Sequence, residues 1–439
     1  MYLFCKRNKG VLLFITALAV LIPVLFSCGG GGGYDVPETT QTDVLITPQI
    51  LKDWVDKGKV NGTGYDRVLI LDVNEFRTNF DLGHIPGSLL VTWGSGAPSD
   101  LYEVRNEGVI PETDMVLSGP TMDALIQRLG INGNTTIVFT SATGSSGSAS
   151  TYLRVTRAYF TFRYWGFPKN RLKILDGLNA AYSAAYPGEL TSEITTVSPS
   201  TYSVKNNPSF GGDLRASLQD MIQVAEGTIS NALIIDGRGA TASCYDGTQK
   251  KTTGIFPNDA GITTDYVAFE GHINGATAIS WGGLFQEVDY DGGGTDYRVY
   301  KPEADIAAVF GAVGLVPSTT AYVHCRTGNI ASTLFAALDI MGWKVQLYDA
   351  SWSQWGQLAG LENGGYLPND SPWRTDTPAR SGLMTFNNGY LAAGEGIENP
   401  AAGGTVYAYD ITGNRIEEED SAYYSGGTGG GGGGGAPGY

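Results

Sequence analysis

The sequence Thr320-Ala321-Tyr322-Val323-His324-Cys325-Arg326-Thr327-Gly328-Asn329-Ile330 decides the fold of the chain. Its first four residues are mainly apolar, which is typical of a short buried strand. A loop of small and polar residues follows, and Thr333 to Leu338 then has the composition of an amphipathic helix. A buried strand that turns through a short loop into a helix is the repeating connection of an α/β domain, and such domains carry functional groups at the carboxyl ends of their strands.

The same order of elements occurs earlier in the chain, which indicates a duplicated domain. Each copy has a helix-like stretch, a strand-like run ending in Asp, a Gly-His-Ile-x-Gly turn and a second apolar strand. In the first copy these are Leu51–Val60, Val68–Asp72, Gly83–Gly87 and Thr136–Phe139. In the second they are Asp213–Val224, Ala232–Asp236, Gly271–Gly275 and Thr320–Val323. Continuous apolar runs predict parallel strands covered on both faces, so we expect an α/β fold with two domains, each a parallel sheet flanked by helices.

The composition along the chain predicts its division into segments. We expect a lipoprotein signal peptide at 1–27, a Gly-rich tether at 28–44, a first domain at 45–190, a linker rich in Ser, Thr and Pro at 191–208, a second domain at 209–366, and an extension at 367–439 that ends in a disordered Gly-rich tail. A chain of 439 residues is too long for one ordinary core. A formal net charge of −16 argues against nucleic acid as a partner, because phosphate binding needs clustered Lys and Arg.

The first 28 residues read as an export signal. Lys6, Arg7 and Lys9 precede the apolar run from Val11 to Phe26. Leu25-Phe26-Ser27-Cys28 resembles the lipobox of bacterial lipoproteins, in which the cysteine is acylated. This resemblance implies lipidation of Cys28 and attachment to the membrane through a lipid anchor, in the cell envelope and, by its sorting residues, at the outer membrane. The alternative is a plain signal peptide with an incidental cysteine.

Cys325 is the candidate nucleophile. The strand delivers it to a loop where the backbone N–H groups of Thr327 to Ile330 can point at its sulfur, and the following helix N-terminus adds partial positive charge. Arg326 adds a formal charge beside it. These features favour the thiolate, which can attack sulfane sulfur and hold the resulting persulfide anion. The alternative is a buried cysteine that only begins a helix.

Several motifs resemble those of the tandem-domain rhodaneses, which are thiosulfate sulfurtransferases. They are the two Gly-His-Ile-x-Gly turns, Asp236-Gly237-Arg238, Cys325-Arg326-Thr327-Gly328 and Tyr348-Asp349-Ala350-Ser351-Trp352-Ser353-Gln354-Trp355. The resemblance covers about residues 45–365. It implies a rhodanese fold in each half, an active site between the domains, a six-residue loop from Cys325 to Ile330, and a supporting role for Asp236 and Arg238.

Two departures from the family pattern matter. Ser141 stands where the first domain would carry a cysteine, so we expect that domain to be non-catalytic. Cys244-Tyr245-Asp246-Gly247 stands where the family has Arg-Tyr-x-Gly, whose arginine helps to hold thiosulfate. One hypothesis is that Cys244 lies near Cys325 and resolves its persulfide or forms a disulfide with it. An isolated buried cysteine is the equal alternative.

The remaining polar candidates are given structural roles. His84 and His272 lie in the two Gly-His-Ile turns, and His324 points to the face of its strand opposite Cys325. Arg77 is a weak candidate for the interdomain site and is expected to be a surface or structural residue. No Cys/His/carboxylate spacing indicates a metal site, so we expect neither metal nor cofactor.

Three functions are open. The first is a sulfurtransferase that moves sulfane sulfur from a small donor anion, thiosulfate or polysulfide, to a thiol or cyanide acceptor through a Cys325 persulfide. The second is an envelope-anchored carrier, or a partner subunit of an outer-membrane redox complex, with little turnover. The third, an inert structural module, fits the first domain but leaves Cys325 unexplained.

Overall fold

The computed structural model describes residues 42–94, 99–107, 111–142, 151–239, 253–255, 263–265, 272–273, 275–359 and 414–426. All of them belong to one compact unit, Val36–Tyr439. None of the helices in this described part is long and apolar enough to cross a membrane.

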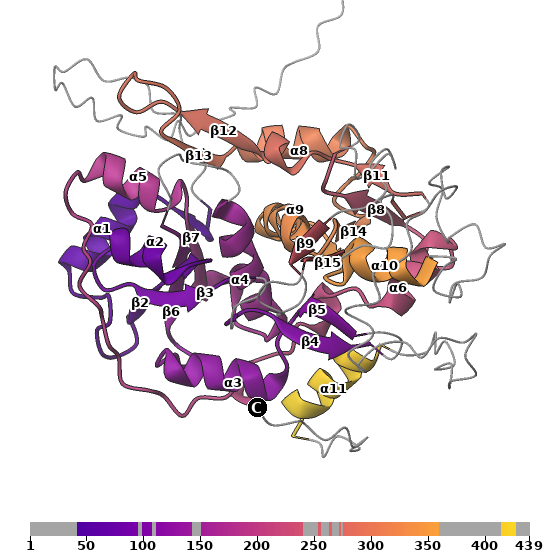
Figure 1. Ribbon diagram of the computed structural model, residues 1–439, viewed down its shortest axis with the longest axis horizontal. Helices are drawn as coiled ribbons and strands as arrows, with labels where there is room; N and C mark the ends of the chain where they lie inside the picture. Colours follow the sequence, from indigo (N-terminus) through magenta and orange to yellow (C-terminus); the bar gives the residue numbers. More distant parts are fainter. Residues whose placement is uncertain are drawn as a thin grey trace, which may run out of the picture. The chain divides into compact units, whose positions relative to one another are not determined.

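The first half of the unit is built on a five-stranded parallel sheet in the order β1-β7-β6-β2-β3 (Figure 1). Its strands are β1 (Leu45–Ile46), β2 (Val68–Asn74), β3 (Leu89–Thr92), β6 (Thr136–Thr140) and β7 (Leu172–Leu175). The helices are α1 (Pro48–Asp56), α2 (Arg77–Leu82), α3 (Gly119–Arg128), α4 (Tyr152–Tyr164) and α5 (Leu178–Ala185). Every residue of β2 is buried, as expected of a central strand covered on both faces.

The second half is built on a four-stranded parallel sheet in the order β11-β8-β14-β15. Its strands are β8 (Ala232–Asp236), β11 (Thr277–Ala278), β14 (Thr320–His324) and β15 (Val345–Leu347). The helices are α6 (Leu218–Ala225), α8 (Glu303–Gly311), α9 (Asn329–Ile340) and α10 (Ser351–Ala359). In chain order, β8, β11, β14 and β15 occupy the places that β2, β3, β6 and β7 occupy in the first sheet. This repeated strand order confirms the predicted fold class, two α/β domains that each contain a parallel sheet.

Three antiparallel hairpins are added to the two sheets. They are formed by β4 (Glu103–Asn106) with β5 (Pro111–Met115), β9 (Thr253–Ile255) with β10 (Thr263–Asp265), and β12 (Phe285–Val288) with β13 (Tyr297–Tyr300). The first hairpin belongs to the first domain, and residues on it reach the cysteine loop of the second.

The two halves pack together through α4 and α9, which lie side by side (Figure 1). Thr156 on α4 shares a hydrogen bond of 2.8 Å with Ser332 on α9. Farther along the same pair of helices, the Tyr159 hydroxyl donates to Asp339 at 2.5 Å, and Arg163 pairs with the same carboxylate at 3.0 Å. Because α9 begins at the cysteine loop, these contacts from the first domain hold the helix that directly follows the loop of Cys325.

The bounds of two predicted helices differ from the expectation. The helix expected at Leu51–Val60 runs from Pro48 to Asp56, because Thr47 accepts from the backbone N–H of Ile50 as its cap and proline is well suited to the first turn. The helix expected from Asp213 begins at Leu218, where Ser217 and Asp220 form a reciprocal capping box. Polar capping residues therefore set both starts, rather than the apolar pattern.

The C-terminal extension contains a helix that the sequence analysis did not predict, α11 (Arg415–Tyr424). Asp420 on this helix is 2% exposed and pairs with Arg105 of β4 at 2.7 Å. The Tyr164 hydroxyl of α4 donates to the same carboxylate at 2.7 Å. The helix thus packs against the first domain. The predicted Gly-rich tail beyond residue 426 lies outside the described residues.

Candidate active site

Cys325 follows β14 directly and is 1% exposed. Its backbone N–H donates to the Ser351 hydroxyl at 3.2 Å, and its carbonyl accepts from the N–H of Trp352 at 3.2 Å. These bonds hold the start of the loop against the first turn of α10. Trp352 and Trp355 are both fully buried, so this motif packs in the core behind the loop.

Gly328 is the cap of α9 and has a φ of +78°, in the left-handed region that favours glycine. A Cβ at this position would lie 2.6 Å from the Asp349 carbonyl oxygen and 2.9 Å from Nη1 of Arg157. The loop therefore lies closely between the end of β15 and helix α4. The first N–H groups of α9 have no acceptor within the helix, so they are available to an anion at the loop.

Asp236 and Arg238, at the end of the neighbouring strand β8, form a buried ion pair. The guanidinium donates to both carboxylate oxygens, with the shortest distance 2.5 Å, and the Arg238 backbone N–H adds a bond of 3.0 Å. Burial would raise the pKa of Asp236, but Arg238 and then His324 hold it below its usual range. The Arg238 guanidinium also lies 5.8 Å from the centre of the Trp352 ring. The pair thus connects the end of β8 to the helix behind the cysteine loop.

His324 is fully buried, with its Nε2 3.8 Å from Asp236. Burial lowers its pKa to about 4, so the imidazole is neutral at physiological pH. Its Nδ1 lies 3.2 Å from the carbonyl oxygen of Cys325. The ring therefore contacts the backbone of the loop, which agrees with the structural role predicted for it.

Three first-domain residues that the sequence analysis did not single out lie at the cysteine loop. Tyr102, which precedes β4, donates its hydroxyl to the Asn329 side chain, and Asp114 of β5 accepts from Asn329 at 3.4 Å. Asp114 also accepts a side-chain hydrogen bond from Thr327. Arg157 of α4 lies against Gly328. The separation of more than 150 residues between these positions and the loop hides this group from any local motif.

The electrostatics of this group show how close its members are. Burial raises the pKa of the Tyr102 hydroxyl well above its usual range, with opposing effects from Arg157, which lowers it, and from Asp114 and Cys325, which raise it. Burial likewise raises the pKa of Asp114 to about 6, against the lowering effect of Arg157. The first domain therefore contributes both a positive and a titratable negative group to the surroundings of Cys325.

The corresponding position in the first domain has no such chemistry. Ser141 follows β6 as Cys325 follows β14, and its hydroxyl donates to the Val73 carbonyl at 2.6 Å. The carboxylate of Asp72, at the position that Asp236 occupies in the second domain, accepts from the side-chain amides of Asn74 and Asn179 at 2.6 and 2.7 Å. Hydrogen bonds from neutral hydroxyl and amide groups thus stand where the second domain has a thiol and an ion pair.

A network of buried charges lies behind the loop. Arg215, 1% exposed, donates to Asp349 at 2.8 Å and to Glu107 of the first domain at 2.6 Å, and it also pairs with Glu417 of α11. Burial raises the pKa values of Glu107 and Glu417, which share this one arginine. For Asp349, Arg215 and then Arg157 outweigh the effect of burial and hold the pKa below its usual range. The network connects both domains and α11 to Asp349, two residues after the end of β15.

Two predicted site residues, Cys28 and Cys244, lie outside the described residues, so the hypothesis that Cys244 lies near Cys325 stays a prediction. Cys325 is a free thiol among the described residues.

The carboxylates of Asp289, Asp291 and Asp296 gather in the loop between β12 and β13, with ligand atoms within 4.8 Å of one another. The first two are exposed, and the loop is held by bonds such as that from the Tyr290 N–H to Asp296 at 2.6 Å.

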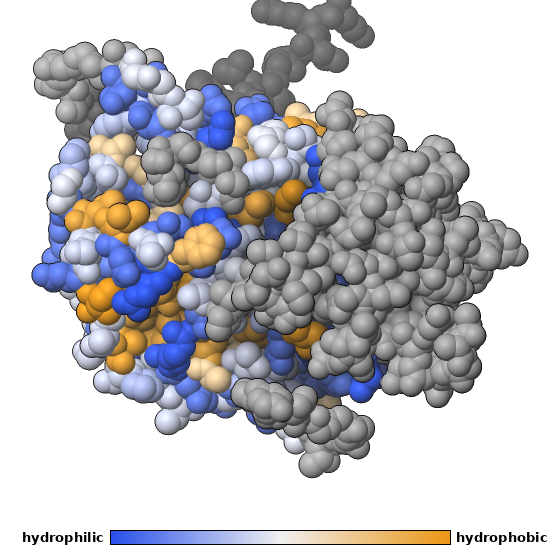
Figure 2. All heavy atoms as spheres, viewed as in Figure 1, coloured by the Kyte–Doolittle hydropathy of each residue, from blue (hydrophilic) through white to orange (hydrophobic). Residues whose placement is uncertain are grey.

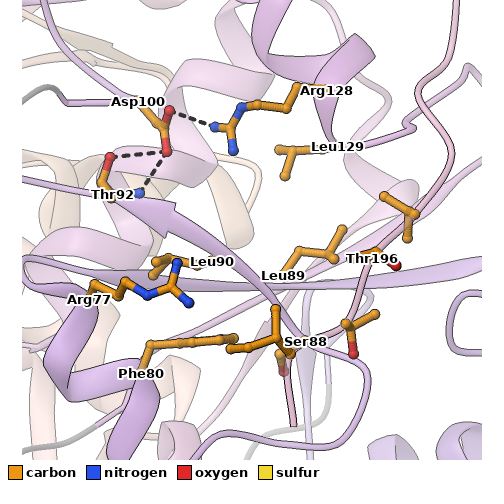
Figure 3. A pocket seen from close by; sticks show the side chains of 13 residues that line it. Arg77, Phe80, Ser88, Leu89, Leu90, Thr92, Asp100, Arg128, Leu129 and Thr196 are labelled. Atoms are coloured by element: carbon orange, nitrogen blue, oxygen red, sulfur yellow. Dashed lines mark hydrogen bonds and ion pairs between the residues drawn. The ribbon is translucent and has the colours of Figure 1, made fainter. Parts of the chain in front are cut away.

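A separate pocket of about 320 Å³ lies on the first domain, beside the edge strand β3 (Figure 3). Arg77 and Arg128 line it, and Arg128 donates to Asp100 at 2.6 Å. Arg77 is 62% exposed and pairs with Asp81, so its placement is that of a surface residue. The face in Figure 2 mixes apolar and hydrophilic residues over this domain. None of the pocket's lining residues belongs to the Cys325 loop, so this pocket is separate from the candidate site.

Comparisons with known proteins were made at the level of sequence and of structure. No protein-family model matches the chain. The sulfur carrier protein TtuD of Thermus thermophilus is 26% identical over 335 residues, which cover 75% of this chain and 97% of TtuD. A Saccharopolyspora erythraea protein named "Putative thiosulfate sulfurtransferase" is 24% identical over 325 residues, covering 73% of this chain and 96% of that protein.

The fold is shared with solved structures of lower identity. The wild-type structure of EanB has a TM-score of 0.53 and 16% identity, covering 76% of this chain and 70% of that chain. An anaerobic ergothioneine biosynthesis enzyme from Chlorobium limicola, in complex with trimethyl histidine, has a TM-score of 0.52 and 17% identity, covering 76% of this chain and 71% of that chain. These structures support the two-domain α/β fold. The two sequence relatives carry the names of a sulfur carrier and of a thiosulfate sulfurtransferase, at 26% and 24% identity.

Proposed function

We propose that the protein is a sulfurtransferase that carries sulfane sulfur as a persulfide on Cys325. The observation that carries this proposal is the position of the thiol. Cys325 directly follows the buried parallel strand β14, and helix α9 begins at Asn329, after the left-handed Gly328. Such a loop offers backbone N–H groups and the positive end of a helix to a sulfur anion.

The reaction proceeds in two transfers. In the first, the Cys325 thiolate attacks the outer sulfur of thiosulfate or polysulfide. A new S–S bond forms on Cys325, and the old S–S bond breaks with its electron pair remaining on the leaving group, sulfite or a shortened polysulfide. In the second, an acceptor thiolate or cyanide attacks the outer sulfur of the persulfide, and Cys325 leaves as the thiolate. Arg326 and the N–H groups from Thr327 to Ile330 stabilise the anion in both states, and the Asp236–Arg238 pair supports the site.

The test is the intact mass of the purified chain after incubation with thiosulfate, mercaptopyruvate or polysulfide. The proposal expects an adduct of one sulfur atom that cyanide removes, that is absent from Cys325→Ser and that persists in Cys244→Ser. A chain that takes up no sulfur from any of these donors would refute it. Sulfur uptake that is lost in Cys244→Ser but kept in Cys325→Ser would place the persulfide on Cys244 and would also refute the proposal.

A carrier function is the second candidate, and the similarity to a protein named a sulfur carrier favours it. A carrier forms the same persulfide but passes its sulfur to a specific protein partner, such as a subunit of an envelope redox complex. The two candidates differ in turnover with small acceptors. An enzyme releases many thiocyanate or sulfide equivalents per chain from excess donor at a high rate, whereas a carrier stays charged with its persulfide and turns over only slowly until its partner is added.

We also propose that the chain is anchored to the cell envelope, at the outer membrane, through acylated Cys28. The proposal rests on the signal-like residues 1–27 and the lipobox-like sequence that ends at Cys28. Metabolic labelling with a radioactive fatty acid tests it. Label should enter the wild-type chain and be absent from Cys28→Ala, and an unlabelled wild-type chain would overturn the proposal.

A further inference from the structure

Arg157 is a fully buried cation at the boundary between the domains. It lies on α4 of the first domain, and its Nη2 donates to the backbone carbonyl of Asp114. Its Nε and Nη1, by contrast, have no hydrogen-bond partner in the described part of the chain. Buried guanidinium N–H groups are costly to leave unpaired, so an arginine with two such nitrogens is unusual and points to an acceptor that is absent from the resting protein.

The unpartnered side of Arg157 lies at the cysteine loop. Nη1 would lie 2.9 Å from a Cβ on Gly328, so the guanidinium contacts the loop backbone three residues after Cys325. The aromatic rings of Tyr102 and Phe160 lie 5.2 and 5.5 Å from the guanidinium carbon. These rings exclude water and supply no formal negative charge, which lengthens the range of the arginine's field.

The nearby carboxylates do not neutralise this charge fully. Asp349 forms an ion pair with Nη2 at 3.7 Å, but it lies closer to Arg215, at 2.8 Å, and also accepts from the Val116 N–H at 2.9 Å. The side chain of Asp114 accepts from Asn329 and Thr327, and burial raises its pKa to about 6, so it is negative at neutral pH but offers no hydrogen bond to Nε or Nη1 of Arg157. Arg157 therefore shares its nearest carboxylate with Arg215, and its Nε and Nη1 have no hydrogen-bond acceptor among the described residues.

We propose that Arg157 supplies the countercharge for the anionic sulfur on Cys325, so that the first domain, which has no cysteine of its own, completes the site of the second. This inference rests on the proposed function. It assigns Arg157 as a positioning residue that acts through the loop at Gly328. It also gives a physical reason why the site can hold an anion although the chain has Cys244 where the family has its thiosulfate-binding arginine.

The charge is needed in both resting states of the site. The thiolate before transfer and the persulfide after it each carry one negative charge, while the donor brings its own charge and leaves with it as sulfite. A fixed cation beside the loop favours both anions over the neutral thiol, and its loss should disfavour them equally. Among the described residues, the other titratable or charged groups that surround the loop are Tyr102, Asp114, Asp236, Arg238, His324, Arg326 and Asp349.

The experiment measures the thiolate directly and separately from sulfur transfer. The full chain, purified in detergent, is alkylated with iodoacetamide across a pH series, and modification of the Cys325 peptide is followed by mass spectrometry. Arg157→Gln should lower the rate at neutral pH about tenfold and move the profile to higher pH, whereas Arg157→Lys should recover part of the rate. Asp114→Asn, which removes a negative group beside the same loop, should move the profile to lower pH.

The control is Arg128→Gln, which removes one positive charge from the first domain at the pocket beside β3 and should leave the profile unchanged. Shifts of opposite sign in Arg157→Gln and Asp114→Asn cannot come from general loosening of the fold, and Asp114→Asn keeps the test valid if Arg157→Gln does not fold. An Arg157→Gln profile equal to wild type, in a chain that still takes up sulfur on Cys325, overturns the inference and leaves the proposed function standing. If the profiles of the variants shift as expected but the wild-type chain takes up no sulfur, the proposed function is overturned instead.

Discussion

Replacing Gly328 by Ala tests the packing of the cysteine loop. The substitution adds one methyl group at a residue whose φ is +78°. That methyl group would lie 2.6 Å from the Asp349 carbonyl oxygen and 2.9 Å from its Cα, both backbone atoms of the segment after β15. Neither atom can move as a side chain could, so the loop itself must shift.

The expected cost has two parts. An L-residue in the left-handed region costs about 1–2 kcal/mol, and overpacking of a closely packed site adds about 1–3 kcal/mol. Gly342, after the other end of α9, separates the two contributions, because its φ is +74° and an added Cβ would have no atom within 4 Å. Gly342→Ala should therefore show the first cost alone, and Gly328→Ala the sum of about 2–5 kcal/mol.

Urea unfolding of both variants, followed by tryptophan fluorescence, measures the two free energies, and the intact-mass assay measures sulfur uptake. Gly328→Ala should be less stable than Gly342→Ala by about 1–3 kcal/mol and should also lose most of its sulfur uptake. Equal costs in the two variants, with uptake unchanged in both, would refute the claim that the loop is held closely between Asp349 and Arg157.

Three further predictions concern buried ionisable groups. Asp420→Ala should destabilise the protein by about 3–5 kcal/mol in urea unfolding, because it leaves buried Arg105 without its carboxylate. The control Glu419→Ala, whose side chain is 53% exposed and 3.6 Å from the same arginine, should cost less than about 1 kcal/mol, and similar costs for both variants would contradict the packing of α11. Burial raises the pKa of Asp176 to about 6 from an ordinary 3.8, so its contribution to stability is present below pH 3.8 and is lost as the pH rises through about 6. Asp176→Asn should remove about 3 kcal/mol of this pH dependence from the free energy of urea unfolding measured between these values, and the same pH dependence in the variant would contradict the prediction. Burial lowers the pKa of His324 to about 4, so its contribution to stability is present above the ordinary pKa of 6.5 and is lost as the pH falls through about 4. NMR should find the imidazole neutral until the pH approaches 4, and a titration near 6.5 would show that the ring is not buried.

The duplicated fold and the position of Cys325 directly after β14 could be predicted from the sequence because their signals are local. The run from Thr320 to Val323 and its counterpart from Thr136 to Phe139 each lie in a strand, β14 and β6, with the expected place in a parallel sheet. Asp236 and Arg238 are two residues apart, so their pairing at the end of β8 follows from one short motif.

The first-domain side of the site could not be predicted because its residues meet only in three dimensions. Tyr102 and Arg157 reach the loop from the segment before β4 and from α4, and neither lies in a motif. Helix α11 was missed for a related reason. Its run of Glu417, Glu418 and Glu419 suggests a solvated segment, and only the buried pair between Asp420 and Arg105 shows that one face is packed.

The measurement that tests the central claim most directly follows one sulfur atom through the protein. Thiosulfate labelled with a heavy isotope in its outer sulfur is given to the chain, and the Cys325 peptide is isolated without reducing agent. The account predicts that the label appears on Cys325 as one additional sulfur and moves quantitatively into thiocyanate when cyanide is added. Label that reaches thiocyanate without passing through the Cys325 peptide, or that never leaves thiosulfate although the chain is folded, would contradict it.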